Sequence, residues 1–119
     1  ILYDRLGGVW HSRAVGRNSA FAHWYGWVLA RANVDRPVAQ MNSGDDLCEE
    51  VSLALDSVLS RGGVHYSEIA ARLNRSPAAP RSFVRYQRVL LELTDQKGRP
   101  FVASVIKILD PPAKDPRPA

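Results

Sequence analysis

Apolar residues recur at three- and four-residue spacing in three stretches of the chain, and this periodicity predicts helices. The first stretch, residues 19–32, is rich in aromatic side chains. The second, residues 45–61, begins with several acids, which favour a helix N-terminus, and ends before two glycines. The third, residues 79–92, gathers apolar side chains on one side of the helical wheel and arginines on the other.

Shorter elements are predicted between and after these helices. Residues 64–66 are read as a short extended piece, and a brief helix with Ser67 as its N-cap is predicted over 67–74. The β-branched, apolar run at residues 100–109 predicts a strand, whose partner is either residues 90–95 or the extended piece. The predicted order is therefore helix, short strand, helix, turn, helix and strand.

The segment SEIAARL at residues 67–73, followed by a turn and the arginine-bearing helix, resembles the helix-turn-helix of many bacterial DNA-binding regulators. Over residues 45–109 the order of elements is similar to the winged helix-turn-helix superfamily, although the turn at 74–80 is longer than usual and carries two prolines. The resemblance implies a mainly α fold with a small β-sheet (α+β). Residues 1–44 would add an aromatic helix, and residues 110–119 form a proline-rich tail.

The net charge of +4 is unevenly distributed, because residues 60–100 carry eight cations against three acids. A cluster of this kind is what binding to a polyanion requires. The resemblance implies that double-stranded DNA is the partner, read in the major groove by the arginine side of the 79–92 helix. The chain would then be a regulator or the DNA-targeting domain of a larger protein. The residues expected to contact DNA are Arg72, Arg75, Ser76, Arg81, Ser82, Arg85, Arg88, Lys97 and Arg99.

Two other functions fit the same residues. A winged helix can be a protein-interaction module within a larger assembly. The aromatic helix would then form the interface, with a partner or with a second copy in a homodimer, through Phe21, Trp24, Tyr25, Trp27 and Val28. Alternatively, the aromatic side chains would stack on single-stranded nucleic acid or RNA. Helical spacing favours packing over stacking, so Trp24 is predicted to be largely buried.

No motif in the chain predicts catalysis, so the sequence indicates a protein that is not an enzyme and that needs no cofactor or metal. Carboxylates beside Cys48 disfavour the reactive thiolate, and the three histidines have no metal-ligand spacing. The uncharged stretches are too short to span a bilayer and no signal peptide is recognisable, which predicts an intracellular location, cytoplasmic or nucleoid-associated, and no membrane partner. The chain begins at Ile1, so a fragment of a longer parent protein or a processed chain is expected.

Overall fold

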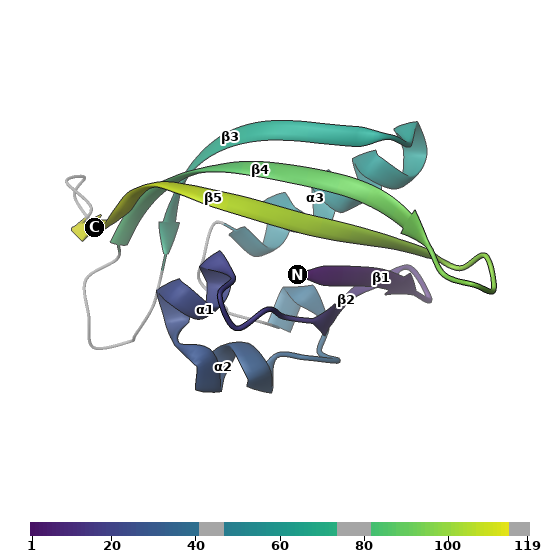
Figure 1. The fold of residues 1–119 in the computed structure, drawn as a ribbon, viewed down its shortest axis with the longest axis horizontal. Coiled ribbons are helices and arrows are strands. Elements are labelled where there is room, and N and C mark those ends of the chain that lie inside the picture. The colour runs from purple at the N-terminus through teal and green to yellow at the C-terminus, as the bar shows by residue number, and fades with distance from the viewer. Residues whose placement is uncertain (41–46, 74–81, 115–119) are drawn as a thin grey trace.

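Five strands form one antiparallel sheet in the order β2-β1-β5-β4-β3 in the computed structural model (Figure 1). The structure describes residues 1–40, 47–73 and 82–114, without the side chains of 47–49 and 111–114. Strands account for 49% and helices for 29%, so the prediction of a mainly α winged helix-turn-helix is wrong. The strands are β1 (Leu2–Leu6), β2 (Val9–Ala14), β3 (Val64–Leu73), β4 (Ser82–Thr94) and β5 (Pro100–Lys114).

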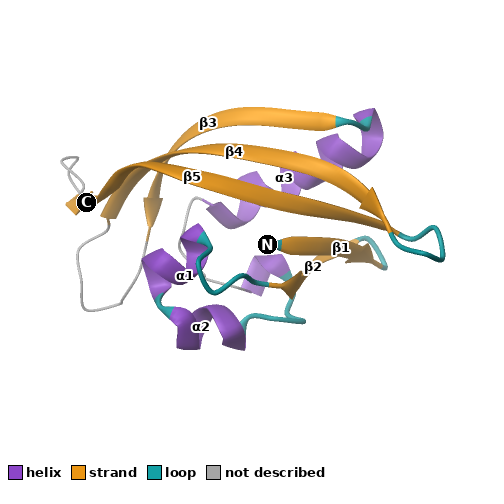
Figure 2. Ribbon diagram, viewed as in Figure 1, coloured by secondary structure: helices purple, strands orange, loops and turns teal. Residues whose placement is uncertain are grey.

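The helical segments lie between β2 and β3 in the chain, as the colouring of Figure 2 shows. They are α1 (Ala20–Tyr25), α2 (Trp27–Ala32), the 3-10 turn η1 (Val38–Gln40) and α3 (Leu47–Arg61). The helix predicted over 45–61 is confirmed as α3. The helix predicted over 19–32 is two helices, because Gly26 adopts a positive φ of 88° and interrupts the helical backbone between them.

Both helices of the predicted helix-turn-helix are strands. Residues 67–73 belong to β3 and residues 82–92 to β4, while residues 74 and 79–81 lie outside the described residues. The two strands pair without a register shift from Val64 opposite Leu91 to Leu73 opposite Ser82. The apolar residues Ile69 and Leu73 are four apart, a spacing that places both on one face of a helix and equally on one face of a strand. Pairing with β4 overrides the helix propensity of the two alanines between them.

The other extended predictions are confirmed and prove too short. Residues 64–66 are the start of the ten-residue β3, and residues 100–109 lie within β5, which is 15 residues long. On one side β5 pairs with the whole length of β4, from Thr94 opposite Pro100 to Ser82 opposite Lys114, and on the other it pairs with β1 at Val102 and Ala103. Asp95 holds the turn between them, because its Oδ1 accepts hydrogen bonds from the backbone N–H groups of Lys97 and Arg99 at 2.9 and 2.8 Å.

The helices α1 and α3 pack on the same face of the sheet. Leu55 and Val58 of α3 share a buried cluster with Leu90 and Val102, and Trp24 of α1 packs on Tyr86 with ring centroids 5.2 Å apart. No described helix covers the opposite face of β3, β4 and β5. Three large apolar side chains are therefore more than half exposed there: Val64, Tyr66 and Val105. Within the described residues, no helix is long and apolar enough to cross a membrane.

Candidate binding groove

The arginines predicted to form one DNA-reading stripe lie on opposite faces of the sheet. Arg85 is exposed on the open face and pairs with Glu68 and Asp110 at 3.3 and 3.1 Å. Arg88 points to the helical face, where only 3% of it is exposed. The expectation that both lie on one face of a helix is wrong, because residues three apart share a face in a helix but not in a strand.

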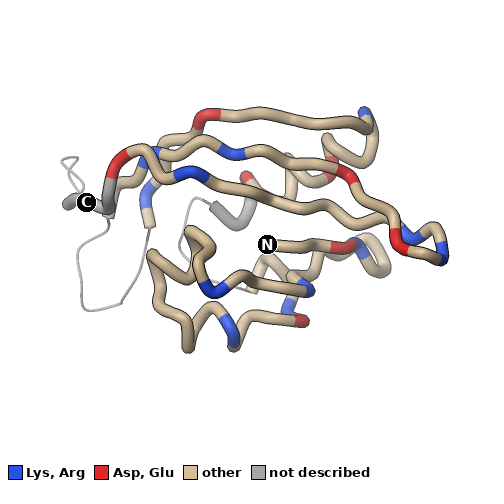
Figure 3. The backbone as a smooth tube through the Cα atoms, in the orientation of Figure 1, with Lys and Arg blue, Asp and Glu red and all other residues tan. Residues whose placement is uncertain are grey.

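The other predicted DNA contacts are also dispersed. Ser82 is buried at the start of β4, Arg72 lies near the end of β3, and Lys97 and Arg99 are in the β4–β5 turn. Figure 3 shows Lys and Arg positions spread over strands and helices and interspersed with acids. The remaining three predicted contacts, Arg75, Ser76 and Arg81, lie outside the described residues. Duplex DNA binding stays a prediction, but the helix on which that prediction depended is a strand.

The aromatic residues of the predicted interface do not form one platform. Trp24 is 5% exposed, which confirms its predicted burial and makes its ring unavailable for base stacking. Tyr25 packs against Phe21 with ring centroids 4.6 Å apart, and Trp27 lies under the guanidinium of Arg17 at 5.1 Å. The last predicted interface residue, Val28, is 85% exposed. An interface through this segment stays a prediction.

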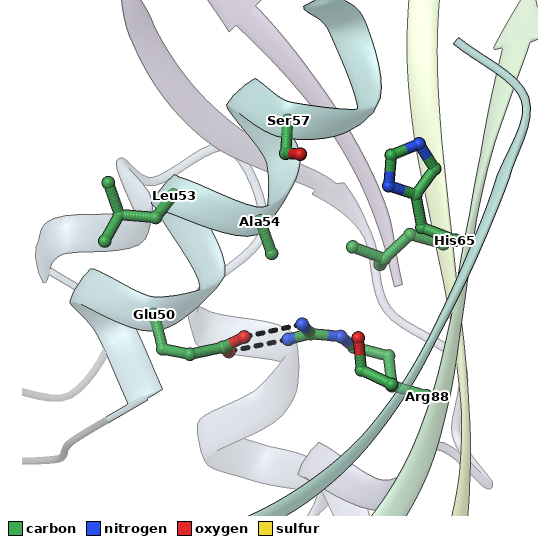
Figure 4. Close-up of a pocket in the computed structure, with 8 residues that line it drawn as sticks. Glu50, Leu53, Ala54, Ser57, His65 and Arg88 are labelled. Atoms are coloured by element: carbon green, nitrogen blue, oxygen red, sulfur yellow. Dashed lines mark hydrogen bonds and ion pairs between the residues drawn. The ribbon is translucent and has the colours of Figure 1, made fainter. Parts of the chain in front are cut away.

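An ion pair joins α3 to β4. The two terminal nitrogens of Arg88 donate to the two carboxylate oxygens of Glu50 at 2.7 and 2.6 Å, which is a bidentate arrangement (Figure 4). The Arg88 side chain is 3% exposed and the Glu50 side chain is 39% exposed. The cation is therefore enclosed, whereas the carboxylate lies between the cation and solvent.

This ion pair forms the base of a groove of about 480 Å³ between α3 and β3. Figure 4 shows Ala54 and Ser57 of α3 on one side and His65 on the other, while the Leu53 side chain points away from His65. Ser67 and Leu90 complete the lining. Leu53 is 63% exposed at the rim. The ring nitrogen Nε2 of His65 donates to the Gly62 carbonyl oxygen at 2.9 Å, because that oxygen can only accept.

The electrostatics of the groove depend on Glu50. Burial alone would lower the pKa of Arg88, but its hydrogen bonds to Glu50 and the charge of that carboxylate raise the pKa instead. The neighbouring Tyr86 has a raised pKa because it is buried and, secondarily, because Glu50 lies nearby. Both groups therefore keep their protons. Of the ion pair at the base of the groove, Glu50 is the member exposed to solvent.

Beside the groove, β3 forms an edge of the sheet with unpaired backbone groups. Glu92 N–H donates to the Gly63 carbonyl oxygen at 3.4 Å, which fixes the alternation of the ladder between β3 and β4. By that alternation, residues 65, 67 and 69 bond to β4, and the N–H and C=O groups of Val64, Tyr66, Glu68 and Ala70 point away from it. In the described part of the chain, no hydrogen bond reaches these outward groups.

The opposite edge of the sheet is covered. Asp35 N–H donates to the Ser12 carbonyl oxygen at 2.6 Å, Ser12 N–H donates to the Arg36 carbonyl oxygen at 3.1 Å, and Pro37 lies in a bridge with His11. Residues 35–37 thus occupy the middle of the β2 edge. The β3 edge lacks two of the usual protective features, since its pairing has no bulge and its sequence has no proline, although it carries the charged Glu68 and Arg72.

Sequence reasoning missed this groove. The sequence patterns place Glu50 among the acids that begin α3 and Arg88 among the predicted DNA contacts, and they do not pair the two residues. One signal was present: in a strand, Arg88 shares a face with the apolar Tyr86 and Leu90, and a buried cation in that position requires an anion as its partner. The position of that anion, 38 residues earlier, is a tertiary contact that periodicity does not reveal.

Comparisons with family models, curated proteins and solved structures return no match for this chain. Among the described residues, no three His, Cys, Asp or Glu side chains lie close enough together to hold a metal ion. The groove and the open edge are therefore the features from which function is inferred.

Proposed function

We propose that this chain is a protein-interaction module that binds an extended segment of a partner protein along the open edge of β3. The observation that carries the proposal is the row of outward N–H and C=O groups from Val64 to Ala70. Such a row pairs with a partner strand through main-chain hydrogen bonds, and pockets beside the strand read alternate side chains of the partner. A regular edge with a groove next to it supplies both requirements.

The chemistry of the edge limits the class of partner. Backbone donors and acceptors that alternate along a strand match another polypeptide backbone in extended conformation. The partner segment would become a sixth strand beside the five of the sheet. Its side chains would alternate between the open face, next to Val64 and Tyr66, and the helical face, next to His65 and Ser67.

A proline substitution tests the edge without disturbing the sheet. The N–H of Glu68 points away from β4, so Glu68→Pro removes an outward donor while sparing the hydrogen bonds between β3 and β4. The matched control is Glu68→Thr, which loses the same ion pair with Arg85 but keeps the N–H. Amide NMR spectra of both variants establish that β3 and β4 stay paired.

Random peptides displayed on phage are selected on the wild-type chain and then measured against the two variants. We expect selected peptides to bind Glu68→Thr within about twofold of wild type and Glu68→Pro about tenfold or more weakly, the equivalent of one or two hydrogen bonds. Amide shifts should concentrate in β3 and the facing turns of α3. Peptides that bind the proline variant as tightly as the threonine variant, or a selection that yields none, would rule out strand addition at β3.

A further inference from the structure

The groove beside β3 faces one side chain of any strand added there, and this inference rests on the proposed function. In a sheet, side chains of neighbouring strands that lie opposite one another point to the same face. Residues His65 and Ser67 point to the helical face and line the groove. A partner residue opposite either of them therefore points toward α3 and enters the space above the Glu50–Arg88 pair.

The base of the groove offers hydrogen-bond acceptors. Each oxygen of Glu50 accepts one hydrogen bond from Arg88 and has a further lone pair, and the Glu50 side chain is 39% exposed. The cation that would attract an acid, Arg88, is 3% exposed and lies behind its carboxylate. The hydroxyl groups of Ser57 and Ser67 also line the groove and can accept.

The wall of the groove is apolar. Leu53, Ala54 and Leu90 line it, and Leu53 is 63% exposed. A long side chain that enters this groove would place its methylene groups against Ala54 and Leu90 and extend a polar head to the carboxylate. Lysine and arginine have this combination of an apolar stem and a cationic head.

We infer that the groove selects a basic residue, lysine or arginine, in the bound segment, with its cation on the outer side of the Glu50 carboxylate. Glu50 would then serve two cations, Arg88 within the chain and the partner residue. The same chain already contains a carboxylate used in this way. Asp4, whose side chain is 3% exposed, pairs with Arg13 at 2.7 Å and with Arg99 at 3.7 Å.

The test uses three synthetic peptides that differ at one central position. The probe is Ac-Thr-Thr-Val-X-Val-Thr-Thr-NH2, where X is lysine, norleucine or glutamate. The sequence is palindromic, so parallel and antiparallel binding present the same pattern of side chains. Norleucine has the lysine stem without the cation and isolates the charge. Binding is measured from amide shifts of the full chain in an NMR titration.

We expect the lysine peptide to bind about tenfold more tightly than the norleucine peptide and the glutamate peptide to bind most weakly. The lysine advantage should shrink in about 0.5 M salt, because part of the contact is exposed to solvent. Equal binding of all three peptides, with shifts in β3, would overturn the basic-residue inference and leave strand addition standing. The absence of β3 shifts with every peptide would overturn both proposals.

A variant at the groove rim provides an independent check. Leu53→Lys places a competing cation at the entrance while leaving Glu50 and Arg88 untouched, and Leu53 is exposed enough to tolerate the change. We expect this variant to bind the lysine peptide no more tightly than the norleucine peptide, because the added cation repels lysine but not norleucine. A lysine preference that persists in Leu53→Lys would show that the cation binds elsewhere.

Discussion

The ion pair between Glu50 and Arg88 predicts a large difference between two similar substitutions. Glu50 pairs with the enclosed Arg88 on the helical face, whereas Glu68 pairs with Arg85 on the open face, where the two side chains are 51% and 48% exposed. In each case a glutamate contacts an arginine of β4. Replacing each glutamate with alanine therefore compares the same chemical change in an enclosed and in a solvated environment.

The expected magnitudes follow from burial. Glu50→Ala removes two charge-assisted hydrogen bonds, each of about 1.5–3 kcal/mol, and leaves the Arg88 charge without a counter-ion. Because Glu50 is partly exposed, water replaces some of this interaction, and we expect a loss of about 3 kcal/mol in the free energy of unfolding. Glu68→Ala should cost at most about 1 kcal/mol. Helix propensity does not explain a loss at residue 50, since alanine is the best helix former.

Urea denaturation of both variants, followed by circular dichroism, measures the difference. At a denaturant slope of about 2 kcal/mol per M, the midpoint of Glu50→Ala should fall by about 1.5 M, and that of Glu68→Ala by about 0.5 M or less. The slopes must agree with wild type for the comparison to hold. A Glu50→Ala variant that is no less stable than Glu68→Ala would refute the enclosed state of Arg88.

Three further substitutions test the helices and the core. Trp24→Ala should lower the free energy of unfolding by about 3–5 kcal/mol, measured by urea denaturation, because the buried ring packs on Tyr86; an unchanged midpoint would contradict this packing. Gly26→Ala should cost about 1–3 kcal/mol in the same assay, because φ of 88° and ψ of 155° favour glycine, and a neutral effect would show that the helix break needs no glycine. Burial raises the pKa of Tyr86, so the protonated Tyr86 contributes fully to stability below the ordinary tyrosine pKa of about 10, and this contribution is lost as pH rises above it. Tyr86→Phe should therefore reduce the fall in melting temperature at alkaline pH. An identical fall in the variant would exclude ionisation of Tyr86 as its cause.

Sequence reasoning identified the elements whose pattern of apolar and polar residues fits either a helix or a strand, but not both. The stretch at 47–61 is long, amphipathic and bounded by acids and glycines, and it is helical. The run at 100–109 is β-branched and apolar, and it is extended. The β4 segment was misassigned because Arg88 and Ser82 are buried polar residues on its core face, which breaks the alternation of apolar and polar residues that marks a half-buried strand.

The groove could not be predicted because it depends on contacts between distant residues. Its lining comes from α3, β3 and β4, and its base is an ion pair between residues 38 positions apart. The open edge of β3 likewise depends on the order of strands in the sheet, which places β3 outermost beside β4. Local propensity instead favoured a helix over the Ala70–Ala71 segment, and the pairing that reverses this preference is a tertiary effect.

The coverage of β2 by residues 35–37 bears on how copies of this chain can assemble. A filament built by joining sheets edge to edge needs two free edges on every subunit, one for each neighbour. The middle of the β2 edge is occupied, so the β2 edge of one molecule is closed to the β3 edge of the next. Joining molecules head to tail through the two outermost strands is therefore disfavoured, and residues 35–37 oppose fibre formation by that route.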